Sequence, residues 1–368
     1  MCFHNTYQTL FKKFSQKSTF FLNFAMRGCL HMGKSVSLHI YICIIDMKAI
    51  LKPFLLLPLF LTACSTTSLI VTNPVIDADA PDPTVIRVGN TYYAAATSGN
   101  NAQAYARYQS KDLKSWQKTG YVFDQWPEWT KGAFWAPEFF VIGNKVMCYY
   151  TARQKSDGTS CIGLASADGP EGQFTDHGPF IRTTNEAIDA FVFNDNGQLY
   201  ITWKAYGLDP SKRPIEILAQ KLSADGMRLE GEPFMLLRDD ERQGMEGQCI
   251  FREGDYYYML YSIRDCCTPQ SDYAVSVARS KRFTGPWEKY KGNPILTGNS
   301  RDIQSCGHGT LVTTPTGNRY YLCHAYYLKR FNEGRKAILQ RISMGKNGWP
   351  AFGSPKSVKA ESRLKVKL

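Results

Sequence analysis

Residues 254–262, Gly-Asp-Tyr-Tyr-Tyr-Met-Leu-Tyr-Ser, combine a turn dipeptide with a strand-forming run. Gly next to Asp or Asn between apolar runs is a strong hairpin signal, and aromatic residues favour the half-buried surface of a strand. The same combination occurs five times along the chain. The turns and the strands that we expect after them are Gly89-Asn90 with 91–96, Gly143-Asn144 with 145–151, Asn196-Gly197 with 198–204, Gly254-Asp255 with 256–262 and Gly317-Asn318 with 319–325.

The five turns define an internal repeat. Successive turns lie 54, 53, 58 and 63 positions apart, and no long stretch shows the 3.6-residue apolar period of a helix. A further short strand-forming run follows most hairpins, and four short strands fit into one period, which is the composition of a propeller blade. We therefore predict an all-β fold, a single five-bladed β-propeller over 73–352, and the repeat disfavours the alternative of an antiparallel sandwich.

The composition agrees with one large folded domain. The chain has 368 residues, of which 43% are hydrophobic, and this is enough to bury a large core. The net charge of +12 is concentrated in part in 1–64, which holds seven Lys and Arg but one acid, and in a basic C-terminal tail, 353–368. Elsewhere the charges are mixed, so we expect no nucleic-acid partner, and we expect a monomer.

Residues 47–64 have the pattern of an export signal. Lys48 and Lys52 form a short basic region at the start of this segment. The apolar run 54–61 that follows is too short to span a bilayer. The run ends in Leu-Thr-Ala-Cys, which resembles a bacterial lipobox with Cys64 as the lipidated residue. We expect export and attachment to the cell envelope, periplasmic or outer, through a lipid anchor alone. An ordinary secretory signal with a chance cysteine is the alternative.

Two segments flank this signal. Because an export signal belongs at the N-terminus, we interpret 1–46 as an upstream extension and Met47 as the true start. Residues 65–72 are expected to be a short linker. The cysteines after Cys64 number seven, so at least one is unpaired within a monomer, and their pairing stays open. None of their spacings matches a zinc site.

Ionisable residues recur just upstream of the hairpin turns, where the innermost strand of each blade should run. Asp82 and Asp189 each lie seven residues before their turn, Glu246 lies eight before and His308 nine before, while the second unit places Trp135 eight before. Because blades pack radially, equivalent positions on the innermost strands meet around one axis. Buried acids repel one another and lose solvation, so such a set indicates a working site.

Cleavage of a glycosidic bond needs this kind of set. One carboxylic acid protonates the leaving oxygen, and one carboxylate acts opposite it. Acids from different blades face each other across the axis, which suits an inverting mechanism with a water between carboxyls roughly 6.5–9.5 Å apart. Trp135 offers an apolar face on which a sugar ring can stack, although core packing is an equal alternative for that residue.

These residues resemble glycoside hydrolase family 43 over about 73–350. The matching segments appear in the family's order, and no single one is decisive. They are Asn73-Pro74-Val75 through Ala80-Pro81-Asp82-Pro83, Trp135-Ala136-Pro137-Glu138, Ile188-Asp189, Glu246-Gly247, Gly307-His308-Gly309, the hairpin 255–262 and the run 277–287.

The resemblance implies an inverting enzyme for arabinose- or xylose-containing polysaccharides. It implies that Asp82 is the general base, that Glu246 is the general acid, and that Asp189 orients Glu246 and tunes its pKa. A charge on Asp189 would favour the protonated form of Glu246. His308 matches a residue at the channel centre, where we expect it to contact substrate. In some members this residue helps to bind a cation, often calcium, although the chemistry requires no cofactor.

Three details of the resemblance need comment. Asp79 lies close to Asp82, and we choose Asp82 because its Pro-Asp-Pro context matches. Phe191 follows Asp189 at a place where many members carry a nearby proline, so we expect Phe191 to contact substrate there. The pair Cys266-Cys267 resembles a feature of arabinan-active members.

The expected partner is a carbohydrate substrate, and the expected activity is that of an exo-acting α-L-arabinofuranosidase. A β-xylosidase and an endo-1,5-α-L-arabinanase are alternatives within the same class. A non-catalytic glycan-binding propeller is the alternative from another class, and the intact set of three acids argues against it.

Overall fold

The computed structural model describes residues 68–183, 186–205, 214–241, 243–298, 302–352 and 363–367. Five four-stranded antiparallel sheets dominate this part of the chain. Its helical content is one 3-10 turn, η1 (Phe331–Glu333), and no helix in the described ranges is long and apolar enough to cross a membrane. The segment 1–46, the signal 47–64 and Cys64 lie outside the described residues.

Each sheet is built from four strands that follow one another in the chain. Blade one contains β2 (Thr84–Val88), β3 (Thr91–Ala95), β4 (Ala104–Ser110) and β5 (Gln117–Phe123). Blade two contains β6 (Trp135–Ile142), β7 (Lys145–Arg153), β8 (Ser160–Asp168) and β9 (Thr175–Ile181). Blade three contains β10 (Ala187–Asp195), β11 (Gln198–Ala205), β12 (Ile215–Leu222) and β13 (Leu229–Asp239). Blade four contains β14 (Met245–Glu253), β15 (Tyr256–Ile263), β16 (Ala274–Ser280) and β17 (Glu288–Lys289). Blade five contains β18 (Ile303–Thr313), β19 (Arg319–Tyr327), β20 (Lys336–Met344) and β21 (Pro350–Phe352).

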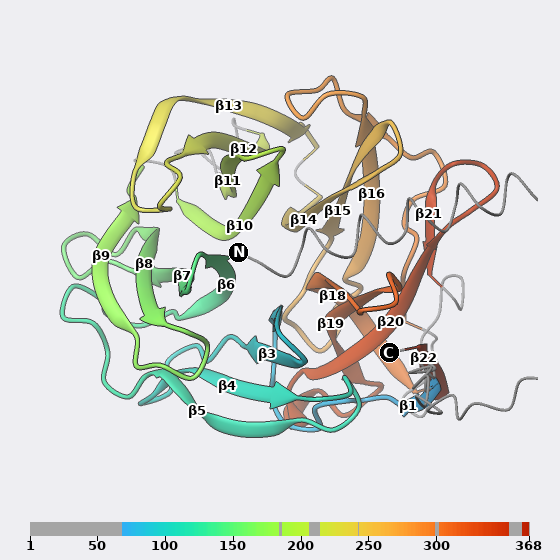
Figure 1. The fold of residues 1–368 in the computed structure, drawn as a ribbon, viewed down its shortest axis with the longest axis horizontal. Helices are drawn as coiled ribbons and strands as arrows, with labels where there is room; N and C mark the ends of the chain where they lie inside the picture. Colours follow the sequence, from blue (N-terminus) through green and yellow to red (C-terminus); the bar gives the residue numbers. More distant parts are fainter. Residues whose placement is uncertain are drawn as a thin grey trace, which may run out of the picture. The chain divides into compact units, whose positions relative to one another are not determined.

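The five sheets form a ring around a central axis (Figure 1). The first strand of each sheet is innermost, and each inner strand contacts the inner strands of the two neighbouring blades, with β18 against β2 completing the circle. The predicted five-bladed propeller is therefore confirmed, and each of the five predicted hairpins joins the first and second strands of a blade.

The aromatic runs after the turns form the second strands, which are covered on both sides by neighbouring blades. In β15, every residue from Tyr257 to Ser262 is buried. Burial of one large apolar side chain such as Leu260 contributes about 1.5–3 kcal/mol to folding. Aromatic rings fill the space between blades: Phe193 of blade three stacks on Phe283 of blade four with ring centroids 5.4 Å apart.

The segment before blade one binds blade five. The Asn73 side chain donates to the Leu339 carbonyl at 3.0 Å and accepts the Leu339 N–H at 2.8 Å. Further along, the Ala80 N–H donates to the Arg335 carbonyl at 2.8 Å. No strand is exchanged between the first and last blades among the described sheets, so residues 73–80 form the seam of the ring.

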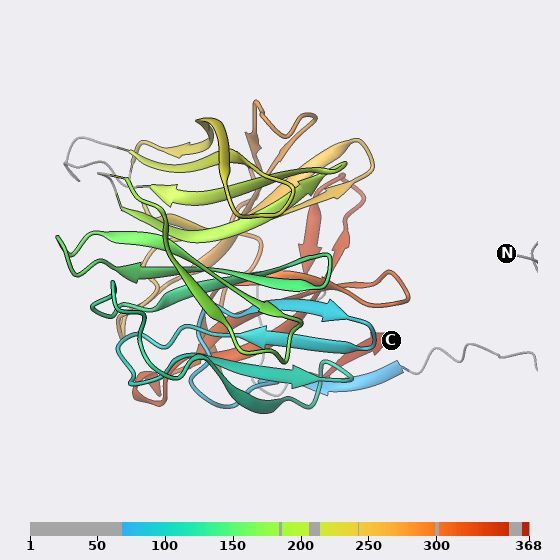
Figure 2. The ribbon, with the colours of Figure 1, turned by 60° about the vertical axis from the view of Figure 1, so that its left-hand side comes forward.

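A small two-stranded sheet lies outside the blades. It pairs β1 (Ser68–Thr72) with β22 (Arg363–Lys367) in antiparallel register, and it brings together segments near the two ends of the described chain (Figure 2). The expected linker 65–72 and the expected tail 353–368 thus each contain a strand.

The cysteines of the described region follow two patterns. The adjacent pair Cys266 and Cys267 forms a disulfide. Five others are buried free thiols within strands, and they include Cys148 and Cys161, which lie on paired strands but opposite other residues. The free thiols are Cys148, Cys161, Cys249, Cys306 and Cys323.

Glu138 in β6 is a buried carboxyl that joins three blades. It is 4% exposed, and the hydroxyl of Thr84 from blade one donates to Oε2 at 3.0 Å. The N–H of Val192 from blade three lies 3.4 Å from Oε1. Burial raises the pKa of Glu138 to about 8, although the two hydrogen bonds act in the opposite direction. Glu138 therefore stays protonated in the folded protein at neutral pH.

We expect this carboxyl to make stability depend on pH. Its folded pKa, about 8, exceeds the ordinary 4.5, so folding stability falls as pH rises from about 4.5 to 8, by ~1.4 kcal/mol for each unit between the two pKa values. Glu138→Gln should lose this dependence. The measurement is the difference in unfolding free energy between the two proteins at pH 4.5 and pH 8 in denaturant titrations. A difference that is constant with pH would contradict the assignment.

Candidate active site

A β-bulge interrupts each inner strand from blade two to blade five. In β10 the register jumps between Ile188 and Phe191, and in β14 it jumps between Glu246 and Cys249. Similar shifts occur near Trp135 in β6 and near Gly307 in β18. Each bulge frees backbone groups from the ladder and turns side chains toward the axis.

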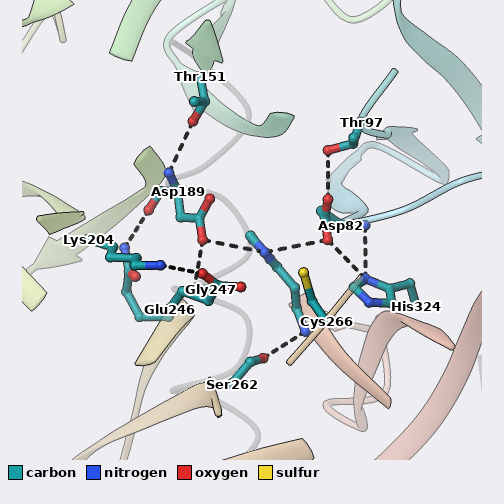
Figure 3. Close-up of polar contacts among 12 residues, drawn as sticks. Asp82, Thr97, Thr151, Asp189, Lys204, Glu246, Gly247, Ser262, Cys266 and His324 are labelled. Carbon is teal, nitrogen blue, oxygen red and sulfur yellow. Dashed lines mark hydrogen bonds and ion pairs between the residues drawn. The ribbon is translucent and has the colours of Figure 1, made fainter. Parts of the chain in front are cut away.

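The bulges give the acids different registers. Asp189 lies inside its bulge, with a left-handed φ of 58°, whereas Glu246 is the last paired residue before its bulge. Gly247, with φ 57°, occupies the position in blade four that corresponds to Asp189. The two acids therefore approach the axis from neighbouring blades along different directions (Figure 3).

The freed N–H groups bind the preceding blade. The Asp189 N–H donates to Thr151 Oγ1 of blade two at 3.1 Å, and the His308 N–H donates to Ser262 Oγ of blade four at 2.8 Å. In blade one, whose inner strand has no bulge, the Asp82 N–H just before β2 lies 3.2 Å from His324 Nδ1 of blade five. These contacts fix the backbone of the candidate site residues across blade boundaries (Figure 3).

Asp82 is surrounded by groups that favour its charged form. Thr97 donates to Oδ2 at 2.8 Å, and Arg335 Nη1 lies 3.0 Å from Oδ1 and 3.3 Å from Oδ2. His324 Nδ1 lies 3.0 Å from Oδ1. Burial opposes ionisation, but the Arg335 guanidinium, helped by the hydrogen-bonding groups around the carboxylate, outweighs it and holds the pKa of Asp82 well below its usual range. Asp82 is therefore an ionised carboxylate.

His324 and Asp79 support this carboxylate. The His324 ring is fully buried and stacks on Tyr273, with centroids 5.5 Å apart. Burial and the nearby Arg335 lower the pKa of His324 to about 4, so the ring is neutral at neutral pH. Asp79 is exposed, and it accepts the Arg335 N–H at 2.8 Å, so it positions the residue that binds Asp82.

Glu246 is held at both oxygens. Lys204 Nζ of β11 lies 2.6 Å from Oε2, and the Tyr273 hydroxyl donates to Oε1 at 2.9 Å. Burial alone would favour the neutral acid, but the ion pair with Lys204 outweighs it and lowers the pKa of Glu246. Lys204 thus favours the charged form of Glu246 when no substrate is bound.

Asp189 has the opposite balance. Its Oδ2 accepts the Gly247 N–H at 3.1 Å. Burial raises the pKa of Asp189 to about 6, although His308 and Lys204 act against the shift. The role expected of Asp189 in keeping Glu246 protonated stays a prediction; in the free protein Lys204 favours the charged form of Glu246.

His308 lies between the two aspartates. Its Nδ1 is 3.6 Å from Asp82 Oδ1 and 3.7 Å from Asp189 Oδ2. No group of three or more His, Cys, Asp or Glu in the described ranges could hold a metal ion. Calcium is coordinated by six to eight oxygens, and a ring nitrogen with two aspartates does not fit this preference. We derive no chemical step through a cation.

The two expected substrate-binding aromatics have different surroundings. Trp135, the first residue of β6, is half-buried, and the Arg153 guanidinium lies 5.2 Å from its ring centroid. Phe191 is 8% exposed and packs in the apolar core shared with blade four. The structure therefore places Phe191 in an apolar core cluster.

Sequence reasoning missed four charged or aromatic residues whose side chains contact the acids. They come from second strands or from loops, whereas the repeated pattern upstream of the hairpin turns marks residues of the inner strands only. One signal was present: Lys204 is a charged residue at the end of an otherwise apolar run. The four residues are Lys204, Tyr273, His324 and Arg335.

Comparison with known proteins defines the class. Residues 71–350 match the sequence model of Glycosyl hydrolases family 43, so the chain belongs to that family. A thermostable family-43 glycoside hydrolase of known structure superposes with a TM-score of 0.70 at 28% identity, covering 78% of this chain and 96% of that one.

Relatives with different activities are similarly distant. The chain is 27% identical to an extracellular exo-α-(1→5)-L-arabinofuranosidase, ArbA of Cellvibrio japonicus, over 75% of this chain and 86% of the relative. It is 26% identical to a xylan 1,3-β-xylosidase of a Vibrio species over 78% of this chain and 58% of the relative. A β-xylosidase of Bacillus subtilis is 26% identical over 69% of this chain. The chain thus spans about half the length of these xylosidases, 58% and 49%.

The site electrostatics predict the pH dependence of a glycosidase reaction. Asp82 stays ionised over the pH range of the assay, so its titration causes no change of kcat/KM near neutral pH. The acid pair loses its proton as pH rises through about 6, the pKa of Asp189, so we expect kcat/KM to fall above that pH. The measurement is kcat/KM on an aryl pentoside from pH 4 to pH 9. A profile that instead rises through pH 6 would reverse the assignment of acid and base.

Proposed function

We propose that this protein is an inverting glycoside hydrolase that acts on arabinose- or xylose-containing polysaccharides or oligosaccharides. The observation that carries the proposal is the electrostatic contrast between two carboxyl sites. Asp82 is held ionised by Arg335 and His324, whereas Asp189 and Glu246 lie beside one another with opposite pKa shifts. Pairs of titratable groups whose environments separate their pKa values are the pattern of acid and base assignments.

In this proposal Asp82 is the general base. Its charge allows it to take a proton from the water that attacks the anomeric carbon, and Thr97, Arg335 and His324 orient its oxygens. Glu246 is the general acid: below about pH 6 the Asp189–Glu246 pair holds one proton, and Glu246 passes that proton to the leaving oxygen. Asp189, which shares the local charge balance with Glu246, tunes and orients it through Gly247. No step of the proposed chemistry passes through a cation, and the groups around His308 do not fit a calcium ion.

For the substrate we propose an exo-acting α-L-arabinofuranosidase. The relative named an exo-α-(1→5)-L-arabinofuranosidase supports this choice, since most of both chains align. A β-xylosidase is the second candidate, because relatives with that name are almost equally similar. An endo-arabinanase is a third, with a named relative in Bacillus subtilis at 28% identity. A non-catalytic glycan-binding propeller is disfavoured because all three acids are present and in contact with supporting groups.

The test is a screen of 4-nitrophenyl arabinofuranosides and xylosides beside linear arabinan, with product sizing. We expect release of single arabinose units, and we expect NMR of the first product to show the inverted anomer because water attacks opposite the leaving group. Xylose release would select the second candidate, and internal cleavage of arabinan would select the third. Binding of arabinan without turnover would make the protein a lectin, and a retained anomer would remove the water-base mechanism.

Variants connect this activity to the site. Asp82→Asn and Glu246→Gln should each keep the fold and lower turnover by about 10²–10⁴-fold, since each removes a proton-transfer group. Asp168→Asn is the matched control and should leave turnover unchanged, because the Asp168 side chain is 89% exposed and pairs with Lys145 at the surface. Near-normal turnover in either active-site variant, with folding confirmed by circular dichroism, would refute the assigned roles.

We also propose export and lipid attachment at Cys64, on the pattern of 47–64. Two relatives are named extracellular, which supports export. In a bacterial host, the wild-type protein should fractionate with membranes, and Cys64→Ser should move it to the soluble fraction. Equal partition of the two proteins would exclude the lipid anchor.

A further inference from the structure

Lys204 occupies a position that repeats in four blades. In the second strands, Thr151, Ser262 and Lys204 each pair with the last residue before the bulge of the inner strand. His324 pairs with Gly307, within the bulged part of β18. The four residues therefore face the axis from equivalent places in blades two, four, three and five.

Three of these residues perform the same task. Thr151, Ser262 and His324 each lie within hydrogen-bond distance of a backbone N–H of the following blade, at 3.1, 2.8 and 3.2 Å. A lysine ammonium has donors only and cannot accept such a bond. In blade three another side chain accepts the N–H of the following blade: the Gly247 N–H donates to Asp189 Oδ2.

Lys204 is thus the exception among the four, because in blade three the bond to the N–H of the following blade is made by Asp189. Its side chain is 1% exposed, and burial of an ammonium is costly unless it is paired. Its Nζ lies 2.6 Å from Glu246 Oε2. The Glu246 side chain is 18% exposed, so the acid has an accessible side while the lysine lies behind it.

Four charged or titratable groups, from three strands and one loop, influence Glu246. Lys204 of β11 and Tyr273, which precedes β16, contact its two oxygens. Asp189 of β10 and His308 of β18 interact with it through their charges. Lys204 is the one permanent cation in this set, and it makes the shortest of these contacts.

We propose that Lys204 is a positioning residue for the general acid, which orients the Glu246 carboxyl from behind and strengthens it as a proton donor. This inference rests on the proposed function. Because Lys204 acts through Glu246, it matters only to the extent that the leaving oxygen needs a proton. Its contribution therefore depends on the leaving group of the substrate and not on the sugar that is bound.

The test compares two glycosides of the pentose that the wild-type protein cleaves. The 2,4-dinitrophenyl glycoside departs without protonation, whereas the disaccharide needs its leaving oxygen protonated. For Lys204→Met we expect kcat on the disaccharide to fall at least about 10-fold, a part of the 10²–10⁴-fold that a general acid supplies, with KM little changed. Activity on the dinitrophenyl glycoside should be nearly that of the wild type.

Two further variants complete the design. Lys204→Arg keeps a cation at the site, so it should recover much of the disaccharide activity, and it also serves if Lys204→Met does not fold. Lys145→Met is the matched control, since Lys145 pairs with Asp168 at the surface and is 60% exposed. It should leave both activities unchanged.

Equal losses on both glycosides in a folded variant would overturn the proposal and make Lys204 a structural residue. A rise in KM alone would also overturn it, because Lys204 would then bind substrate. No recovery in Lys204→Arg would exclude a role for the positive charge. If the wild-type protein cleaves no pentoside, the proposed function fails first and this inference falls with it, an outcome distinct from equal losses.

Discussion

The hydrogen bond between an inner-strand N–H and a side chain of the preceding blade is the contact on which the site depends. A regular ladder would use these N–H groups within its own sheet. The bulges release them, and a buried N–H needs a partner. The partner comes from the neighbouring blade, as in the bond from Asp189 to Thr151. One device therefore both joins the blades and directs the acids to the axis.

The same device gives each acid its own surroundings, because each blade contributes a different residue at the repeated position. A neutral histidine supports Asp82, and a hydroxyl supports Asp189. A lysine in blade three binds Glu246 of blade four. The chemical contrast between the acids thus arises from substitutions at one equivalent position of a repeated unit.

Local patterns in the sequence predict the fold well. The five turns and the strands after them depend on neighbouring residues, so their recurrence was enough to give five blades. The acids and His308 could also be predicted, since they lie at a nearly constant distance before each turn. Asp189 lies seven positions before its hairpin turn and Glu246 lies eight before its own. This difference of one residue is visible in the sequence, but only the bulges explain it.

Contacts between distant segments could not be predicted in this way. Arg335 reaches Asp82 across more than 250 positions, and β1 pairs with β22 across almost the whole described chain. Phe191 shows a related limit. Its position two residues after Asp189 does not indicate on which side of the bulged strand its ring lies. In the structure that ring packs in the core.

The seam of the ring has a consequence for how the protein loses activity on heating. Residues 73–80 join blade one to blade five, and Asp82 and Arg335 lie at the same junction. At every other boundary the two blades follow one another in the chain. The ring can therefore open at this junction while each blade keeps its four strands. A partial opening there separates the base from its arginine and histidine while all five sheets keep their strands. Inactivation on heating would then precede the loss of β-structure.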